Sequence, residues 1–232
     1  MASTLTNSSH SNFRSDAYSA LELNESGAKS TARPRVLSVL SSLLERVVVR
    51  NERYAIASNC SLSPPRMTVF HGLRAPAISI EKYLERIFKY ANCSPSCFVV
   101  AYAYLDRFIR RQPDIPITYL NVHRLLITSV MVAAKFLDDA YYNNAYYAKI
   151  GGVTTQEINS LELEFLFGLD FRLHIPVGVF ENYCAHLEKE VAFGGVYQIE
   201  KSLQLGCALD GTSTQSQCQK QRAVVRCSYA GL

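Results

Sequence analysis

One stretch of the chain, residues 120–137, is apolar on every side through its middle, and this feature limits the possible folds more than any other. Its apolar residues recur at helical spacing, at Leu120, Leu126/Ile127, Val130, Ala133/Ala134 and Leu137. A helix with an apolar circumference has to be surrounded by other elements. Thr118 is a suitable N-cap residue for such a helix. The pattern therefore predicts a central helix that starts after Thr118 and ends near residue 137.

This apolar stretch does not predict a membrane span. It contains Thr128 and Lys135, and no window of about 18 consecutive apolar residues occurs in the chain. The 232 residues are 48% hydrophobic, which is enough to build a core and excludes general disorder. The net charge of +4 arises from 24 basic and 20 acidic residues spread along the chain. A charge this small does not by itself indicate nucleic acid or a membrane surface as a partner.

Apolar repeats and capping residues predict further helices on both sides of the central one. The predicted helices run from about 35 to 57, from Ser79 onwards, from Ser94-Pro95 to before Pro113, over 144–150, from the capping box Thr154–Glu157 to about Leu169, and over 176–191. No strand with a convincing alternating pattern occurs. The predicted fold class is all-α, with helices joined by short loops around one buried helix.

Three segments lack a sustained apolar period. Residues 1–33 are rich in Ser, Asn and Thr and predict a disordered arm, without the apolar region of a secretory signal. Residues 59–76, with Pro64, Pro65 and Pro76, predict a linker, and the polar residues 192–232 predict a poorly ordered tail. The seven cysteines form no CxxC pair, so we expect free thiols in a reducing compartment.

The sequence contains none of the short motifs that carry catalysis or cofactor binding. GxGxxG, GxxxxGK[ST], HExxH and GxSxG are all absent. The adjacent pair Asp138-Asp139 is a poor metal site, because neighbouring helical side chains point about 100° apart. We therefore expect no catalytic residue, no cofactor, no bound metal and no small-molecule ligand.

Four tyrosines, at 141, 142, 146 and 147, cluster around the short helix predicted at 144–150. Exposed aromatic rings can stack on the bases of single-stranded nucleic acid, but such a platform needs a positive groove beside it. Only Lys149 is near in the sequence. The favoured interpretation is that the tyrosines pack this helix onto the bundle with their hydroxyl groups outward.

Charged residues in apolar surroundings indicate a surface that binds another protein. Lys135 lies in the last turn of the central helix, where its ammonium group must reach water or find acceptors. Asp138 puts negative charge at the same end, which the helix dipole disfavours. Glu162 lies inside an apolar stretch of the helix that begins after Thr154. Each has an ordinary explanation as an exposed polar face, but with Phe136 and Leu166 they would form an apolar patch edged by charges.

Four strings carry a resemblance to a known family. They are YLDRF (104–108), AAKFLDD (133–139), NNAYYAKIGG (143–152) and LELEFLFGLDFRL (161–173). Together they look like a cyclin box. In detail they resemble the plant P-type cyclins, also called U-type, which are related to the yeast cyclin of the phosphate-response kinase. The resemblance covers residues 77–175 closely, with weaker support over 34–58 and 176–191.

The resemblance implies a single five-helix cyclin box that serves as the regulatory subunit of a cyclin-dependent protein kinase and is not itself an enzyme. Lys135 is similar in placement to the family's interface lysine and Glu162 to its partner glutamate, which bridge to the kinase near its movable C-helix. Phe136 and Asp138 follow that lysine as in other members, and Leu166 falls at an apolar interface position. The expected setting is cell-cycle and cell-division control or nutrient (phosphate) signalling.

The chain also departs from the family pattern. Asp106 in YLDRF resembles a structural aspartate of the family. The stretch M-R-A-I-L, with which cell-cycle cyclins recruit substrates, is replaced here by residues 75–80, APAISI. The usual Arg is therefore missing, which leaves open both substrate docking at that groove and the Arg partner of Asp106. The residues after 191 are too few for a second box, so we expect a one-box cyclin.

Two alternative functions remain open at this point. A nucleic-acid-binding factor built on a cyclin-like box would need two boxes and a basic surface. A non-kinase adaptor would have no need for charges at Lys135 and Glu162. Ser63 lies in a Ser-Pro-Pro-Arg sequence, which has the form of a proline-directed phosphorylation site. Localisation to the nucleus, the cytoplasm or both is expected from the class of partner.

Overall fold

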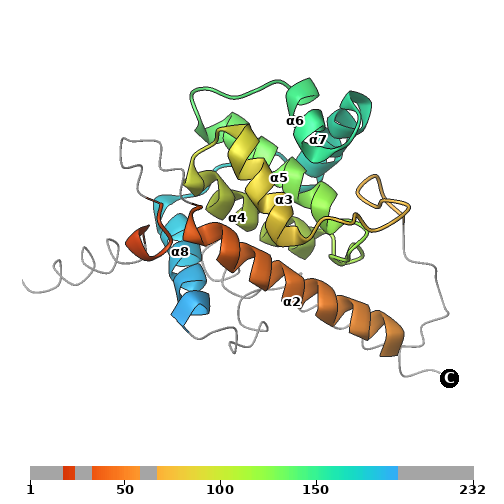
Figure 1. The fold of residues 1–232 in the computed structure, drawn as a ribbon, viewed down its shortest axis with the longest axis horizontal. Helices are drawn as coiled ribbons and strands as arrows, with labels where there is room; N and C mark the ends of the chain where they lie inside the picture. Colours follow the sequence, from red (N-terminus) through yellow and green to blue (C-terminus); the bar gives the residue numbers. More distant parts are fainter. Residues whose placement is uncertain (1–17, 24–32, 58–66, 193–232) are drawn as a thin grey trace, which may run out of the picture.

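The described part of the chain consists of helices without a strand (Figure 1). The computed structural model describes residues 18–23, 33–57 and 67–192. Its main helices are α2 (Arg35–Ala57), α3 (Ile80–Ala91), α4 (Pro95–Arg111), α5 (Val122–Leu137), α6 (Asn144–Gly151), α7 (Thr155–Gly168) and α8 (Val177–Ala192). The predicted all-α fold class is confirmed. Helices α3 to α7 correspond to the five helices predicted for the box, and α2 and α8 flank them.

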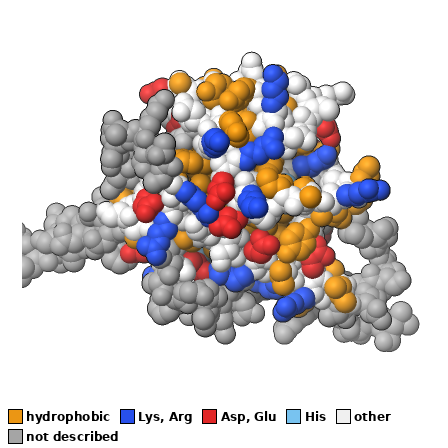
Figure 2. All heavy atoms as spheres, in the orientation of Figure 1, with side chains coloured by type: hydrophobic (Ala, Val, Ile, Leu, Met, Phe, Trp, Pro, Cys, Tyr) orange, Lys and Arg blue, Asp and Glu red, His pale blue; other side chains and the backbone are white. Residues whose placement is uncertain are grey.

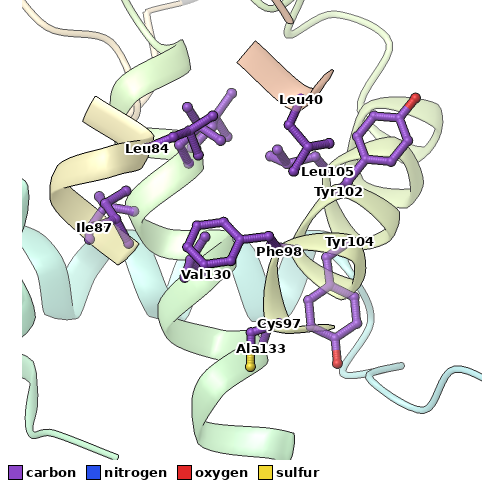
Figure 3. Packing of buried hydrophobic residues seen from close by; sticks show 14 of the residues in the cluster. Leu40, Leu84, Ile87, Cys97, Phe98, Tyr102, Tyr104, Leu105, Val130 and Ala133 are labelled. Atoms are coloured by element: carbon purple, nitrogen blue, oxygen red, sulfur yellow. The ribbon is translucent and has the colours of Figure 1, made fainter. Parts of the chain in front are cut away.

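Helix α5 lies in the centre of this bundle, as its apolar circumference predicts. It contacts α3, α4, α6 and α7, which surround it in Figure 1. Every side chain from Val122 to Ala134 is buried except that of Arg124. Figure 3 shows Val130 of α5 lying against Phe98 of α4. Because burial of one such side chain stabilises a fold by about 1.5–3 kcal/mol, α5 contributes a large share of the packing energy of the box.

The start of α5 differs from the prediction. The helix begins at Val122 with Asn121 as its N-cap residue, so Thr118 is not the cap. The Asn121 amide donates to the Pro116 carbonyl oxygen at 2.8 Å, and Asn121 Oδ1 accepts from the Thr118 N–H at 2.8 Å. Asn121 thus folds the preceding turn. Thr and Asn are both good cap residues, so only the tertiary path of this loop selects between the two.

The other predicted helix starts are confirmed. Helix α3 begins after Ser79, whose hydroxyl accepts from the Lys82 N–H at 3.3 Å. Helix α7 begins with the capping box, in which Glu157 N–H donates to Thr154 Oγ1 at 3.1 Å and Thr154 N–H donates to Glu157 Oε2 at 2.8 Å. Helix α4 begins after Ser94, with proline in its first turn. A side-chain cap contributes about 1 kcal/mol, so the caps at Ser79 and Thr154 help fix where these helices begin.

The predicted disordered arm is wrong for part of its length. Residues 18–23 form a turn in which Leu21 is fully buried, and the Tyr18 ring lies 6.1 Å from the Phe180 ring of α8. The apolar residues around Leu21, among them Tyr18 and Leu23, span too short a stretch to show a helical or strand period, so the sequence pattern did not reveal this burial. The rest of the predicted arm, linker and tail, at 1–17, 24–32, 58–66 and 193–232, lies outside the described residues.

The predicted linker at 59–76 also contributes to the core, which the sequence did not indicate. Phe70 is fully buried, and its ring meets those of Phe108 in α4 and Phe165 in α7 edge-on, at 5.3 and 6.3 Å between centroids. Helices α4 and α7 approach closely at this cluster. A Cβ atom at Gly168 would lie only 2.3 Å from the Phe108 ring, so the approach requires glycine there.

Ion pairs connect α2 to its neighbours. Arg33, just before α2, donates to Glu81 at 2.5 Å and also to Glu85, both on α3. Arg46 of α2 pairs with Glu190 of α8. Figure 2 shows side chains of both charges over this face of the molecule. The Arg33 pairs lie at the surface and contribute only about 0–1 kcal/mol each, whereas the Glu190 carboxylate is buried, so its pair with Arg46 mainly offsets the cost of that burial. The buried apolar face of α2 therefore accounts for most of its attachment.

Candidate protein-binding site

Three helices bring Lys135, Asn144 and Glu162 together in one hydrogen-bonded network. Lys135 Nζ lies 2.6 Å from Glu162 Oε1 and donates to Asn144 Oδ1 at 2.5 Å. The Asn144 amide donates in turn to Glu162 Oε2 and to Asn159 Oδ1, both at 2.7 Å. Two charges that the sequence placed separately in apolar surroundings are therefore in direct contact.

The local sequence of each helix explains the position of its member of the network. Lys135 lies in the last turn of α5, where the helix dipole favours a cation. Asn144 is the first residue of α6, because the preceding Asn143 caps that helix. Glu162 lies in the middle of α7. The side chains of Lys135 and Glu162 remain 24% and 19% exposed, so another molecule can still reach them.

Exposed apolar side chains lie on α5 and α7, two of the three helices that form this network. Phe136 and Phe167 are 49% and 62% exposed, and Leu163 is also exposed one turn before Phe167. We call the surface made by Lys135, Phe136, Glu162, Leu163 and Phe167 the α5–α7 face. Single exposed apolar residues are ordinary, whereas a group of them beside fixed charges is typical of a protein-binding surface.

Two of the predicted site residues are partly turned inward. Leu166 is half-buried and packs against the core. The carboxylate of Asp138 accepts from the N–H and the hydroxyl of Ser94 at 3.2 and 3.1 Å, and from the Cys97 thiol at 3.3 Å. The negative charge that is unfavourable at the end of α5 therefore lies at the start of α4, where the helix dipole favours it. Contact of these two residues with a partner stays a prediction.

Asp106 has partners other than an Arg from the segment before α3. It is only 3% exposed, lies 2.8 Å from Arg110 one turn later in α4, and accepts from the Tyr183 hydroxyl of α8 at 2.6 Å. Burial raises the pKa of the Asp106 carboxyl, and the nearby Arg110 opposes this rise. An Arg on the same helix thus takes the place of the one missing from residues 75–80. This arrangement supports a structural role for Asp106.

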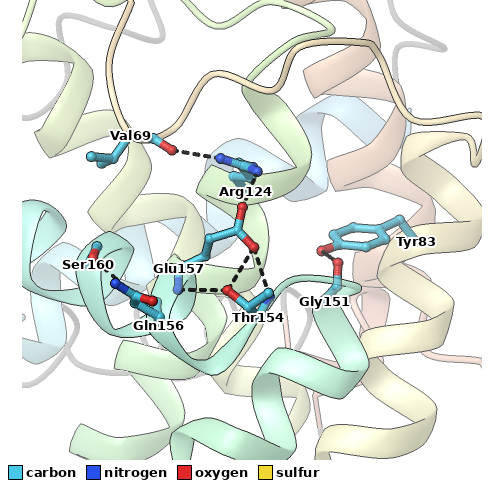
Figure 4. A network of polar contacts seen from close by, with 8 residues as sticks. All are labelled: Val69, Tyr83, Arg124, Gly151, Thr154, Gln156, Glu157 and Ser160. Atoms are coloured by element: carbon cyan, nitrogen blue, oxygen red, sulfur yellow. Dashed lines mark hydrogen bonds and ion pairs between the residues drawn. The ribbon is translucent and has the colours of Figure 1, made fainter.

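A second ion pair joins α5 and α7 near the other end of α5 (Figure 4). Arg124 Nη2 lies 2.8 Å from Glu157 Oε1, and Arg124 Nη1 donates to the Val69 carbonyl oxygen at 2.9 Å. Glu157 Oε2 accepts from the N–H and the hydroxyl of Thr154 at 2.8 and 2.9 Å. These hydrogen bonds from Thr154 lower the pKa of the Glu157 carboxyl, with a smaller contribution from Arg124. This pair therefore holds the local backbone together.

The structure bears on some of the remaining predictions, concerning metal sites, membrane spans and cysteines, but not on the predicted phosphorylation of Ser63. Within residues 18–23, 33–57 and 67–192, no group of three or more His, Cys, Asp or Glu residues is placed to hold a metal ion. None of the helices in those ranges has both the length and the apolar character needed to cross a bilayer. Cys93, Cys97 and Cys184 are buried free thiols. Ser63 lies outside the described residues, so its phosphorylation stays a prediction.

Asn144 and Asn159 are members of the network that the sequence did not predict. A signal for Asn144 was present, because two successive Asn residues precede the short helix and only Asn143 is needed as its cap. Asn159 gave no signal, since it is an ordinary polar residue on the exposed side of α7.

Comparison with known proteins gives matches that cover much more of the chain than the site residues. Residues 34–173 match the family model described as Cyclin. Cyclin-U4-1 of Arabidopsis thaliana is 61% identical over 157 residues, which cover 68% of this chain and 76% of that protein. Cyclin-P4-1 of Oryza sativa subsp. japonica is 52% identical over 167 residues, covering 72% and 79%. Cyclin-U2-2 of Arabidopsis thaliana is 48% identical over 203 residues, covering 87% and 85%.

The family match has two consequences, one for the extent of the fold and one for the role of the molecule. It begins at residue 34, so it includes α2, which the resemblance in the sequence covered only weakly. It also identifies the role of the molecule as regulatory rather than enzymatic. The chain belongs to the cyclin family, and its relatives are U-type and P-type cyclins of plants.

Proposed function

We propose that this cyclin is the regulatory subunit of a cyclin-dependent protein kinase and binds that kinase through the α5–α7 face. The observation that carries the proposal is the Lys135–Asn144–Glu162 network, in which fixed charges lie beside exposed apolar side chains. Lys135 and Glu162 are held in place before a partner arrives, so little side-chain entropy is lost on binding. Fixed charges of this kind favour one orientation of the partner over others.

The apolar residues of the face supply the contact area in this proposal. Phe136 follows Lys135 on α5, while Leu163 and Phe167 lie one turn apart on α7. Aromatic side chains that become desolvated dominate the energetics of most interfaces. A helix of the kinase laid across this face would meet apolar side chains and the two charges beside them, as in other helix-binding surfaces.

Activation is then a shift in the conformational population of the kinase. By holding the movable C-helix of the kinase in one position, the cyclin favours the state in which the kinase's Lys–Glu ion pair forms and ATP phosphates are held correctly. The cyclin contributes contacts and no reacting group. A 100-fold shift toward the active state requires contacts that favour that state by about 2.7 kcal/mol.

The double exchange Lys135→Glu/Glu162→Lys tests this proposal. It keeps an opposite-charge pair inside the cyclin but reverses both charges that the kinase meets, so the fold should be retained. We expect capture of kinase from plant extract and stimulated phosphorylation of a histone substrate to fall at least tenfold, roughly 1.4 kcal/mol. The matched control Asp114→Lys/Lys189→Glu makes corresponding charge reversals at exposed positions in the loop before α5 and on α8, away from the α5–α7 face, and should change neither.

Three results would contradict the proposal. Equal capture of the kinase by wild type and double exchange would show that the α5–α7 face is not the binding site. Failure of folded wild-type protein to recover any kinase would remove the kinase function and favour a non-kinase adaptor. Recovery of nucleic acid in place of kinase would favour a nucleic-acid-binding factor. Thermal unfolding of each variant establishes that it is folded.

A further inference from the structure

We propose that the exposed side of α3, together with the adjoining end of α6, docks an acidic segment of the protein substrates that the bound kinase phosphorylates. The inference rests on the proposed function, since it names the substrates of the same complex. The surface consists of Lys82, Arg86 and Lys89 on α3 and Lys149 on α6, all of them exposed, and we call it the basic α3 face. Figure 2 shows blue side chains interspersed with red ones over the part of this face where α3 lies.

The period of α3 sets the spacing of these charges. Its apolar side chains are buried on one side of the helix, which brings Lys82, Arg86 and Lys89 to the opposite side. With a rise of about 1.5 Å per residue, Lys82 lies about 6 Å from Arg86 and about 10 Å from Lys89 along the axis. An extended peptide places alternate side chains about 6.6 Å apart. Carboxylates at alternate positions of an extended segment would therefore match the spacing of Lys82 and Arg86, whereas the gap of about 4.5 Å from Arg86 to Lys89 is shorter and the long side chains have to make up the difference.

Helix α6 adds the fourth cation and aromatic side chains to the surface. Arg86 Nη2 donates to the Lys149 carbonyl oxygen at 3.0 Å, and the Tyr146 hydroxyl donates to the Tyr90 carbonyl oxygen at 3.1 Å. In the sequence only Lys149 was near the tyrosines. The fold brings Arg86 and Lys89 of α3 beside them, which makes this surface more basic than the sequence indicated.

The two carboxylates closest along α3 offset only part of the positive charge of the basic α3 face. Glu81 and Glu85 both point to Arg33, with which they form ion pairs. Lys89 Nζ lies 5.3 Å from the centroid of the Tyr90 ring, a cation–π contact that offsets only a small part of its charge. In the part of the chain that the structure describes, none of the four cations forms an ion pair. An acidic partner would therefore find positive charge that is only partly offset.

The geometry favours carboxylates of a peptide over a phosphate-bearing strand. Three of the four cations are lysines, which pair as point charges with carboxylate and phosphate alike, so the choice between the two rests on the aromatic side chains. A nucleic-acid platform also needs open aromatic faces for the bases. The Tyr142 and Tyr146 rings instead lie against one another, at 4.0 Å between centroids.

Fluorescence anisotropy on the free cyclin, without any kinase, tests this surface directly. The probe is a fluorescein-labelled peptide of about 12 residues with Glu at alternate positions, and a peptide with Gln in place of Glu is the control probe. The variant Lys82→Glu/Lys89→Glu/Lys149→Glu leaves Arg86 and its hydrogen bond in place. The matched variant Arg53→Glu/Arg74→Glu/Lys189→Glu makes the same change of net charge at exposed positions elsewhere.

At about 0.15 M salt we expect wild type to bind the Glu peptide more tightly than the Gln peptide, with an affinity that falls as salt rises. The triple variant on the basic α3 face should lose at least tenfold in affinity, and the matched variant should retain it. Absence of Glu-peptide binding by wild type, or equal loss in both triple variants, would overturn the inference. Tighter binding of a single-stranded oligonucleotide through the same lysines would overturn it as well.

A kinase assay extends the test to substrates. In the active complex, the triple variant should raise KM about tenfold for a substrate that carries an acidic segment and leave kcat unchanged. A short substrate peptide without that segment should show no change. Equal KM for both substrates in wild type and variant would overturn the docking role. Because peptide binding is measured without kinase, failure of the proposed function is recognised separately, by a wild-type cyclin that activates no kinase.

Discussion

Helices α5 and α7 are joined by two ion pairs, one toward each end of α5, and the two pairs have different surroundings. Arg124 and Glu157 also bond to the Val69 carbonyl group and to the N–H of Thr154, so this pair fixes backbone. Lys135 and Glu162 bond only to one another and to the side chain of Asn144. The first pair is part of how α7 begins. The second holds no backbone group in place and can be altered with little cost to the fold.

Because of this difference, one of the two ion pairs should contribute to stability and the other to binding, although both join the same two helices. An exposed ion pair contributes little to stability unless it satisfies groups that would otherwise lack partners. The Arg124 end meets that condition because it satisfies backbone groups at the start of α7. The Lys135 end lies beside exposed Phe136 and Phe167, where fixed charges can orient a partner. Substitutions at the Arg124–Glu157 pair should therefore change the free energy of unfolding, and substitutions at the Lys135–Glu162 pair should change the affinity for the proposed kinase.

The largest effect is expected at the Arg124 end. The double substitution Thr154→Ala/Glu157→Gln removes the capping box and the ion pair together. We expect the free energy of unfolding to fall by about 2 kcal/mol in chemical denaturation. The kinase affinity of the protein that remains folded should not change. A loss of kinase affinity in this variant would show that the ion pairs at the two ends of α5 do not act independently.

A smaller effect, mainly on binding, is expected for Phe167→Ser. Removal of this exposed ring should lower the affinity for the proposed kinase about tenfold, or 1.4 kcal/mol, measured by biolayer interferometry. The free energy of unfolding should fall by less than about 1 kcal/mol, because the side chain is mostly exposed and its ring packs on that of Phe171, which is itself exposed. Leu73→Ser, at an exposed position before α3, is the matched control. Equal losses in the two variants would contradict a specific role for the α5–α7 face.

Asn144→Ala should weaken kinase binding about fivefold. The substitution removes the amide that orients both Lys135 and Glu162, while Asn143 still caps α6. Asn159→Ala, which touches Asn144 but neither charge, should have less effect. Titration calorimetry with purified kinase measures both variants. If Asn159→Ala costs as much affinity as Asn144→Ala, the orienting role of Asn144 is wrong.

The smallest effect concerns pH and belongs to the Arg124 end. The pKa of the Glu157 carboxyl is lower in the folded chain than its ordinary value of 4.5. Ionised Glu157 therefore stabilises the fold above that value, and this contribution is lost as the pH falls through the folded value. The stability difference between wild type and Glu157→Gln should be largest near pH 7 and shrink toward about pH 3. A difference that does not change with pH would contradict the role of the carboxylate.

The helices of the box could be predicted because their signals are local. The apolar circumference of α5, the cap at Ser79 and the capping box of α7 each require only residues close in sequence. The start of α5 could not be predicted, because Asn121 bonds to a loop whose path depends on tertiary contacts. The burial of Phe70 could not be predicted for the same reason, because its ring packs against residues of two helices that are distant in the sequence.

The candidate site also contains some features that could be predicted from the sequence and others that could not. Lys135 and Glu162 were recognisable from their sequence because each is a charge in an apolar stretch, and the family resemblance paired them. Their link through Asn144 was not recognisable, since it joins the ends of two helices to the middle of a third. The inward hydrogen bonds of Asp138 also depend on the packing of α5 against α4.

Hydroxyl-radical footprinting of the cyclin with and without purified kinase tests the central claim most directly, because it requires no substitution. Phe136 and Phe167 on the α5–α7 face, and Met67 and Leu73 in the segment before α3, are all exposed in the free chain. The account predicts that the kinase lowers the oxidation rates of Phe136 and Phe167 and leaves those of Met67 and Leu73 unchanged. Protection of Met67 and Leu73 with Phe136 and Phe167 still oxidised would contradict it.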